Sequence, residues 1–97
     1  MSSNFQQSDL SGDDTDAVLR TVLSDVLGLE ADRVAEFNRD TGLFGHLPEL
    51  DSMAVAGLLT EIEDRLGIFI DDDEVDGEML ETYGALRDFV VAKRARD

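Results

Sequence analysis

The sequence predicts an all-α fold of four helices, with a long connection after the first helix and a short third helix. Three segments support this prediction because their apolar residues recur at helical spacing: 15–27, 52–66 and 83–93. A short helix within residues 72–80 completes the set. The apolar run Ile68–Ile70 could form a strand, but no second strand is available to pair with it, so an extended turn is expected there.

The composition excludes several classes of protein. The 97 residues have room for one small domain, and no apolar run approaches the roughly 18 residues of a membrane span. The absence of cysteine excludes disulfides, thiolate metal sites and thiol nucleophiles. The net charge of −15 argues against binding to nucleic acid or anionic membranes and favours basic protein partners. No signal peptide is visible, so a cytoplasmic protein is expected.

The first helix is expected at Thr15–Leu27. Residues 1–12 are mostly Ser, Asn, Gln and Asp, and they are expected to form a flexible N-terminal tail. Asp14 or Thr15 can cap the helix, and Gly28 is its natural stop. Two adjacent i, i+4 rows give the helix one wide apolar face. These rows are Val18, Val22 and Val26, and Leu19, Leu23 and Leu27.

Residues 29–50 form a long connection, which in a compact domain usually has a function or contains a short element of its own. Ala31–Glu36 is expected to supply a turn of helix. His46, the single histidine, could act as a general base near Ser52, but a place on the loop surface is favoured because no hydrolase elbow motif accompanies it. The residues expected to anchor the loop on the core are Leu29, Val34, Phe37, Leu43, Phe44 and Leu47.

A second long helix is expected from Asp51 or Ser52 to Leu66, with Gly67 as its stop. A serine at this position lies next to unpaired amides and the positive end of the helix dipole, which favour a phosphate. Residues lie ~100° apart around a helix axis, so Ser52 falls at the border between the core face and the exposed face. The predicted core face is Val55, Leu59, Ile62 and Leu66, flanked by Leu58. The residues predicted to point outward are Met53, Gly57, Thr60, Glu61 and Asp64, with Ala56 and Glu63 near the border.

The acidic run Asp71–Gly77 partly matches a calcium-binding EF-hand loop that starts at Asp72. Position twelve of such a loop requires a bidentate glutamate, and here it is Tyr83, so no specific metal site is predicted. The interpretation favoured for the run is an acidic start to the short third helix.

The last helix is expected at Tyr83–Lys93, with Thr82 as its N-cap and a short basic tail at 94–97. Together, the four expected helices define a folded domain that spans residues 13–93.

Four separate motifs resemble those of acyl and peptidyl carrier proteins, over roughly Thr15–Ala92. Phe44 stands eight residues before Ser52, where carriers place an anchoring aromatic residue. The other three motifs are Asp51-Ser52-Met53 at the attachment site, Leu66-Gly67-Ile68 at the helix exit and Glu81–Val90 in the closing segment. The resemblance implies a four-helix acyl-carrier-protein-like bundle.

In this family the serine carries 4′-phosphopantetheine, so the resemblance implies attachment to Ser52 by a separate phosphopantetheinyl transferase that uses coenzyme A and magnesium. It implies a monomeric carrier rather than an enzyme. The arm's thiol holds an acyl or aminoacyl group as a thioester and presents it to loading and acyl-transfer enzymes with basic docking patches. Asp51 is expected to cap the helix and to help hold the transferase's metal or a basic partner residue. The expected partner-recognition residues are Met53, Ala56, Gly57, Thr60, Glu61, Glu63 and Asp64.

The residues just before the serine depart from the pattern of fatty-acid-synthase carriers. Those carriers usually have a glycine and a small residue ahead of the Asp-Ser pair, whereas this chain has Pro48-Glu49-Leu50. The string Leu47–Val55 is similar instead to stand-alone bacterial carriers associated with exosortase and exopolysaccharide gene sets.

Two other classes of protein remain open from the residues alone. One is an unmodified helical adaptor in which Ser52 only begins a helix. The other is a small calcium-binding helical protein that uses the carboxylates of Asp71–Asp76.

The excess of acidic residues predicts that the fold is sensitive to salt. Repulsion among 23 acids opposes the compact state, and dissolved ions screen it. The melting temperature should therefore rise between low and high ionic strength, measured by circular dichroism in sodium chloride. A melting temperature that stays flat over that range would contradict the prediction.

Overall fold

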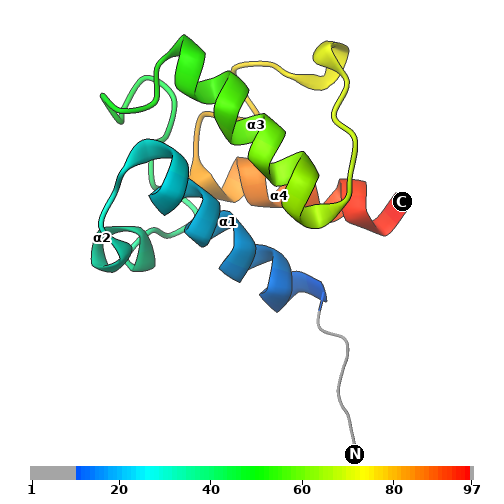
Figure 1. Cartoon of the computed structure of the whole chain (residues 1–97), viewed down its shortest axis with the longest axis horizontal. Coiled ribbons are helices and arrows are strands. Elements are labelled where there is room, and N and C mark those ends of the chain that lie inside the picture. The colour runs from blue at the N-terminus through cyan, green and yellow to red at the C-terminus, as the bar shows by residue number, and fades with distance from the viewer. Residues whose placement is uncertain (1–10, 97) are drawn as a thin grey trace, which may run out of the picture.

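The structure is a computed structural model that describes residues 11–96 (Figure 1). The elements follow in the order α1 (Ser11–Leu27), α2 (Ala31–Ala35), α3 (Ser52–Leu66), the 3-10 turn η2 (Asp72–Glu74) and α4 (Tyr83–Arg96). Within these residues there are four α-helices and no β-strand beyond an isolated bridge between Gly42 and Thr82. The predicted all-α fold is confirmed, and the turn of helix expected at Ala31–Glu36 is α2.

Helix α1 is the centre of the fold because it packs against α2, α3 and α4. Leu19, Val22 and Leu23 on its predicted apolar face are fully buried. Burial of each such side chain contributes about 1.5–3 kcal/mol. Gly28 ends the helix at a φ of 70°, a left-handed conformation that favours glycine. The residues that enclose this face are Val34, Phe37, Leu43, Leu58, Ile62, Leu86 and Val90.

Helix α1 begins earlier than its sequence predicts. It starts at Ser11, so two residues of the predicted tail belong to the helix, and residues 1–10 lie outside the described residues. Thr15, expected as a possible cap, lies in the second turn of α1, and its side chain is buried. Its Oγ1 accepts a hydrogen bond from Arg94 Nη1 at 2.9 Å. The hydroxyl of Thr15 therefore contacts α4 and does not mark the start of α1.

Helix α4 continues to Arg96, three residues beyond the predicted end at Lys93. The basic residues expected in a C-terminal tail therefore extend the helix, and Arg94 contacts α1 through Thr15. The predicted cap is confirmed, because Thr82 Oγ1 accepts a hydrogen bond from Ala85 N at 3.1 Å.

The predicted third helix is only the three-residue turn η2. The amide of Asp71 donates to Glu74 Oε1 at 3.0 Å, and the amide of Met79 donates to Asp76 Oδ1 at 2.9 Å. Acidic side chains thus accept hydrogen bonds from backbone amides that would donate to carbonyl oxygens in a longer helix. Aspartate side chains commonly compete with the helix backbone in this way. The run before η2 is extended as expected, with Ile68 and Ile70 buried and Phe69 exposed.

The connecting loop is attached to the start of α4 by backbone hydrogen bonds. Leu43 N donates to Glu81 O at 2.9 Å, and Gly84 N donates to Arg39 O at 3.0 Å. A Cβ on Gly84 would lie 2.9 Å from that same carbonyl oxygen, so the close approach requires glycine. These bonds fix the loop that precedes the second long helix.

Asp16 on α1 is the centre of a polar network that joins three helices. Its carboxylate accepts hydrogen bonds from Arg20 Nε at 2.9 Å and from the hydroxyl of Tyr83 on α4. Arg87 Nε on α4 lies 3.9 Å from Asp16 Oδ1 and has no hydrogen-bond partner among the described residues. Asp16 is therefore the shared counter-charge of two arginines.

Arg20 extends this network to α2. Its guanidinium donates to the carbonyl oxygens of Val34 at 2.6 Å and Phe37 at 3.0 Å, which lie at and just beyond the end of α2. It also lies 4.8 Å from the centre of the Tyr83 ring, within the range of a cation–π contact. The end of α2 is thus satisfied by a side chain of α1.

The network lowers the pKa of Asp16. Burial raises this pKa, but hydrogen bonds from Tyr83 and Arg20 and the charges of Arg20 and Arg87 outweigh burial, so the pKa lies below its ordinary value of 3.8. Burial raises the pKa of the Tyr83 phenol, and its hydrogen bond to Asp16 raises it further, so the phenol stays a donor. A carboxylate with a lowered pKa stabilises the fold fully above its unfolded pKa, and this contribution is lost as the pH falls through the folded pKa.

Asp16→Ala should lower the free energy of unfolding at neutral pH by about 1–3 kcal/mol, because it leaves a buried phenol without its acceptor and removes the counter-charge of two arginines. The difference from the parent should shrink as the pH falls below 3.8, the ordinary pKa of the lost carboxyl group. Urea unfolding across the acid range measures both effects.

Asp64→Ala is the matched control, because Asp64 is an exposed carboxylate on α3. It should change stability little. Equal losses in the two variants at neutral pH would contradict the role assigned to Asp16.

Candidate functional site

Asp51 sets the start of α3. Its backbone is extended, with φ −97° and ψ −175°, and its Oδ1 accepts a hydrogen bond from Ala54 N at 2.8 Å. This is the geometry of an N-cap, so the capping role expected for Asp51 is confirmed. Ser52 is consequently the first residue of the helix, and Gly67 ends it at a φ of 65°.

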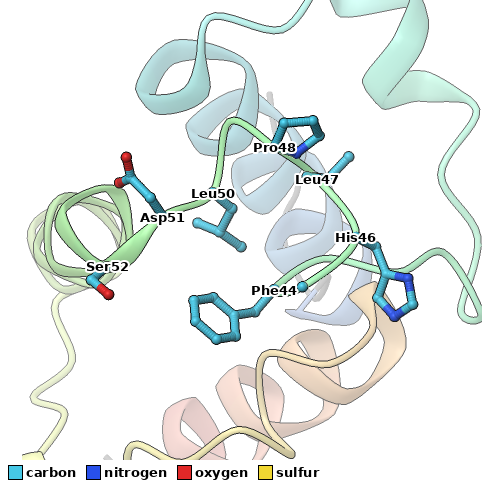
Figure 2. Close-up of a pocket in the computed structure, with 8 residues that line it drawn as sticks. Phe44, His46, Leu47, Pro48, Leu50, Asp51 and Ser52 are labelled. Atoms are coloured by element: carbon cyan, nitrogen blue, oxygen red, sulfur yellow. The ribbon is translucent and has the colours of Figure 1, made fainter.

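Ser52 is exposed and lies between two hollows. The first, which we call the loop pocket, has a volume of about 410 Å³ (Figure 2). Its lining residues are Phe44, Gly45, His46, Leu47, Pro48, Leu50, Asp51 and Ser52. The second, the α3 groove, has a volume of about 230 Å³. Its lining residues are Phe44, Ser52, Val55, Val75, Asp76, Gly77 and Leu80.

Phe44 separates the two hollows instead of anchoring the loop in the core. The other five predicted anchors are buried, but Phe44 is 42% exposed. Figure 2 shows its ring extending from the loop toward the start of α3. Its backbone is held in place by a hydrogen bond from Phe44 N to Leu80 O at 2.9 Å. The prediction of a buried anchor was therefore wrong for this residue, because its side chain lines the site.

His46 is on the loop surface, as favoured from the sequence. Its ring points away from Ser52, on the opposite side of Phe44 (Figure 2). The imidazole lies over Gly42, where a Cβ would come within 2.3 Å of His46 Cγ. This geometry gives His46 no contact with the serine hydroxyl.

The most buried residues of α3 lie on a face slightly rotated from the predicted one. Leu58, expected only as a flanking residue, and Ile62 are fully buried. The remaining members of the predicted face are partly buried: Val55, Leu59 and Leu66. The shift turns Val55 toward the α3 groove, next to Ser52.

The predicted partner-recognition face is largely exposed. Met53, at the tip of α3, is 86% exposed, and Ala56, Gly57, Thr60 and Asp64 are exposed as well. A Cβ on Gly57 would lie 3.8 Å from Val26 Cγ1 on α1, which is ordinary contact, so the fold itself does not require glycine there.

Two acids of that face are engaged within the fold. Glu63 Oε2 accepts a hydrogen bond from Ile70 N at 2.7 Å. Glu61 accepts from Arg65 Nε at 3.0 Å, and the same arginine reaches Asp25 on α1 at 3.0 Å. Both carboxylates therefore take part in contacts within this chain.

Glu49, part of the unusual string before the serine, is paired with α2. Its Oε2 lies 3.1 Å from Arg33 Nη1. A hydrogen bond from its own backbone amide and the one from Arg33 lower its pKa. Glu49 therefore ties the loop before Ser52 to α2.

The groove residues Val75, Gly77 and Leu80 were not predicted from the sequence. The one available signal was an apolar Val75 within an acidic run. Among residues 11–96, no group of three or more His, Asp or Glu residues is placed to hold a metal ion. Glu74 and Asp76, two acids of the EF-hand-like run, instead accept hydrogen bonds from nearby backbone amides.

Comparisons with known proteins point to one family. The family described as "Phosphopantetheine attachment site" matches residues 17–90. The fold is similar to the solution NMR structure of a holo acyl carrier protein from Nitrosomonas europaea, with a TM-score of 0.72 and 35% sequence identity. The match covers 86% of this chain and 96% of that chain. No curated protein has significant similarity to the sequence. None of the helices within residues 11–96 combines the length and apolar character needed to cross a membrane.

Asp51→Ala should lower the free energy of unfolding by about 1 kcal/mol, because α3 loses its cap. The melting temperature should fall by about 4–8 °C, as is typical of small domains for a loss of this size. Asp51→Asn should melt close to the parent, since asparagine caps equally well without the charge. Equal losses in both variants, measured by circular dichroism, would assign the effect to charge and not to capping.

Proposed function

The chain belongs to the phosphopantetheine-binding carrier family, and on that premise we propose that Ser52 is the residue that carries the 4′-phosphopantetheine arm. The protein is a carrier, similar to an acyl carrier protein, and not an enzyme. The observation that supports Ser52 is its place as an exposed residue at the first position of α3, on the rim of both hollows.

Two serines, Ser24 and Ser52, have side chains that the structure describes. Ser24 Oγ donates a hydrogen bond to Leu29 O at 2.7 Å, so it holds the end of α1. Ser52 Oγ has no hydrogen-bond partner in the described part of the chain and lies at the positive end of the α3 dipole. A phosphodiester on Ser52 would place its negative charge where a helix favours it.

The residues around Ser52 fit such an arm. When attached, the arm supplies the thiol that holds an acyl group as a thioester, chemistry for which this chain has no cysteine of its own. Val55, Val75 and Leu80 offer an apolar surface beside the attachment point. Asp51 keeps the serine at the helix start through its bond to Ala54 N. The α3 groove would therefore take the apolar part of the carried group.

A carrier domain implies a phosphopantetheinyl transferase and client enzymes. We propose that these partners bring basic docking patches to the exposed face of α3 around Met53. Asp51 and Asp64 supply carboxylates there that are exposed to solvent. Electrostatic attraction of this kind speeds encounter and favours basic partners over acidic ones. The other residues of this proposed face are Ala56, Gly57 and Thr60, with Glu61 and Glu63 at its edge.

We also propose the finer assignment to the stand-alone bacterial carriers associated with exosortase and exopolysaccharide gene sets. Its support is the string Leu47–Val55 together with the Arg33–Glu49 pair, which gives Glu49 a structural role. A cytoplasmic location, a monomeric state and a folded domain of about residues 13–93 stay predictions from the sequence.

Incubation of the protein with coenzyme A, magnesium and a promiscuous phosphopantetheinyl transferase should raise its intact mass by about 340 Da, the mass of the arm. Ser52→Ala should abolish the gain, because the acceptor oxygen is lost. Mass spectrometry of the whole protein measures it.

Ser24→Ala is the control for this assignment and should be modified like the parent. A gain that persists in Ser52→Ala would place the arm elsewhere. No gain in the parent, with a transferase that modifies a known carrier in the same assay, would refute the proposed function.

A further inference from the structure

One wall of the α3 groove is not a helix. Val75, Gly77 and Leu80 lie in the irregular segment between η2 and α4, and they face Ser52 and Val55 of α3 across the groove. Figure 1 shows the yellow trace leaving the end of α3, and this segment is the stretch that returns from η2 to the start of α4. Without intrahelical hydrogen bonds, the position of this wall depends on the contacts at its two ends.

The wall is fixed at Leu80 by main chain and core packing. Leu80 is 3% exposed, and its carbonyl oxygen accepts the amide of Phe44 at 2.9 Å. In the middle, a Cβ on Gly77 would have no neighbour within 4 Å, so nothing packs there. Val75 itself is only partly buried against the core, so its position also depends on the contact on its other side.

That other side is held by an ion pair between Glu74 and Lys93. Lys93 Nζ on α4 donates to Glu74 Oε1 at 2.8 Å, and Glu74 directly precedes Val75. The side chains are 12% and 26% exposed for Lys93 and Glu74, less than in any other ion pair of the described residues. Salt screens a shielded pair less than an exposed one, so this contact ties η2 firmly to α4.

We propose that the Glu74–Lys93 pair determines the chain-length specificity of this carrier by holding Val75 against the α3 groove. The inference rests on the proposed attachment of the arm to Ser52. The groove of about 230 Å³ is smaller than the roughly 300–1,000 Å³ of typical pockets for drug-sized ligands, so it suits a short linear acyl group. Glu74 and Lys93 are positioning residues, since neither lines the groove.

The physical consequence is that loss of the pair widens the groove. Without Lys93, the segment around Val75 keeps the turn hydrogen bonds of η2 and its packing against the core, but it loses the shielded side-chain contact with α4. A longer acyl chain can then displace Val75 from α3 at lower cost. Each further methylene that enters the groove leaves water and stabilises the folded state.

The experiment loads the parent and the variants with butyryl, hexanoyl, octanoyl and decanoyl pantetheine arms, using acyl-coenzyme A and the promiscuous transferase. The readout is the melting temperature of each acylated protein minus that of the same protein with the unacylated arm, so a general loss of stability cancels. In the parent, each methylene that fits in the groove should raise the melting temperature by about 3–6 °C. Beyond a short chain, further methylenes should raise it no more.

Lys93→Met, which keeps the aliphatic stem and removes the charge, should move that limit to longer chains. Glu74→Gln should move the limit in the same direction but less far, because its amide oxygen can still accept from Asp71 N and Lys93 Nζ but carries no charge. Lys93→Arg should keep the parent limit, because it restores the ion pair. Asp88→Asn, which breaks the exposed pair with Arg39 elsewhere on α4, should leave the limit unchanged.

An identical chain-length limit in Lys93→Met, Glu74→Gln and the parent would overturn this inference even though every protein is loaded. If a variant does not fold, the other variant decides the outcome. Failure of all proteins to gain the arm would instead contradict the attachment to Ser52, so the two proposals fail separately.

Discussion

The packing of α1 against each of the other three α-helices is the constraint on which this structure depends. Its wide apolar face places α2, α3 and α4 around one axis, but an apolar face alone leaves the helices free to slide. The network around Asp16 removes that freedom, since Arg20 holds the end of α2 and Tyr83 belongs to α4. A satisfied hydrogen-bond network has one geometry, which fixes the register of the helices.

That register reaches the site through the connecting loop. Hydrogen bonds from Leu43 and Phe44 to the carbonyls just before α4 place the loop relative to that helix. Phe44 then divides the surroundings of Ser52 into a loop pocket on one side and the α3 groove on the other. Both hollows therefore depend on how the loop is placed relative to α4, a helix that begins thirty-one residues after the serine.

The few cations of this acidic chain act mainly inside the fold. Arg33, Arg39 and Arg65 each pair with an acid on another element or loop, and Lys93 pairs with η2. These contacts join segments and leave the remaining carboxylates on the outside, which suits an exposed α3 face that meets basic partners. The same charges thus contribute both to the fold and to the character of its surface.

The sequence by itself determined the three long helices, the glycine stops of α1 and α3, the Asp51 cap and the place of Ser52, because helical period and capping chemistry are local properties. Only the tertiary structure decided the rest. Thr15 is buried where Arg94 of α4 contacts it, and Phe44 lines the site while its neighbours in the loop are buried in the core. Val75 faces Ser52 across a groove whose wall depends on a contact between Glu74 and Lys93, nineteen residues apart. Such contacts are set by packing between distant segments, which no local pattern encodes.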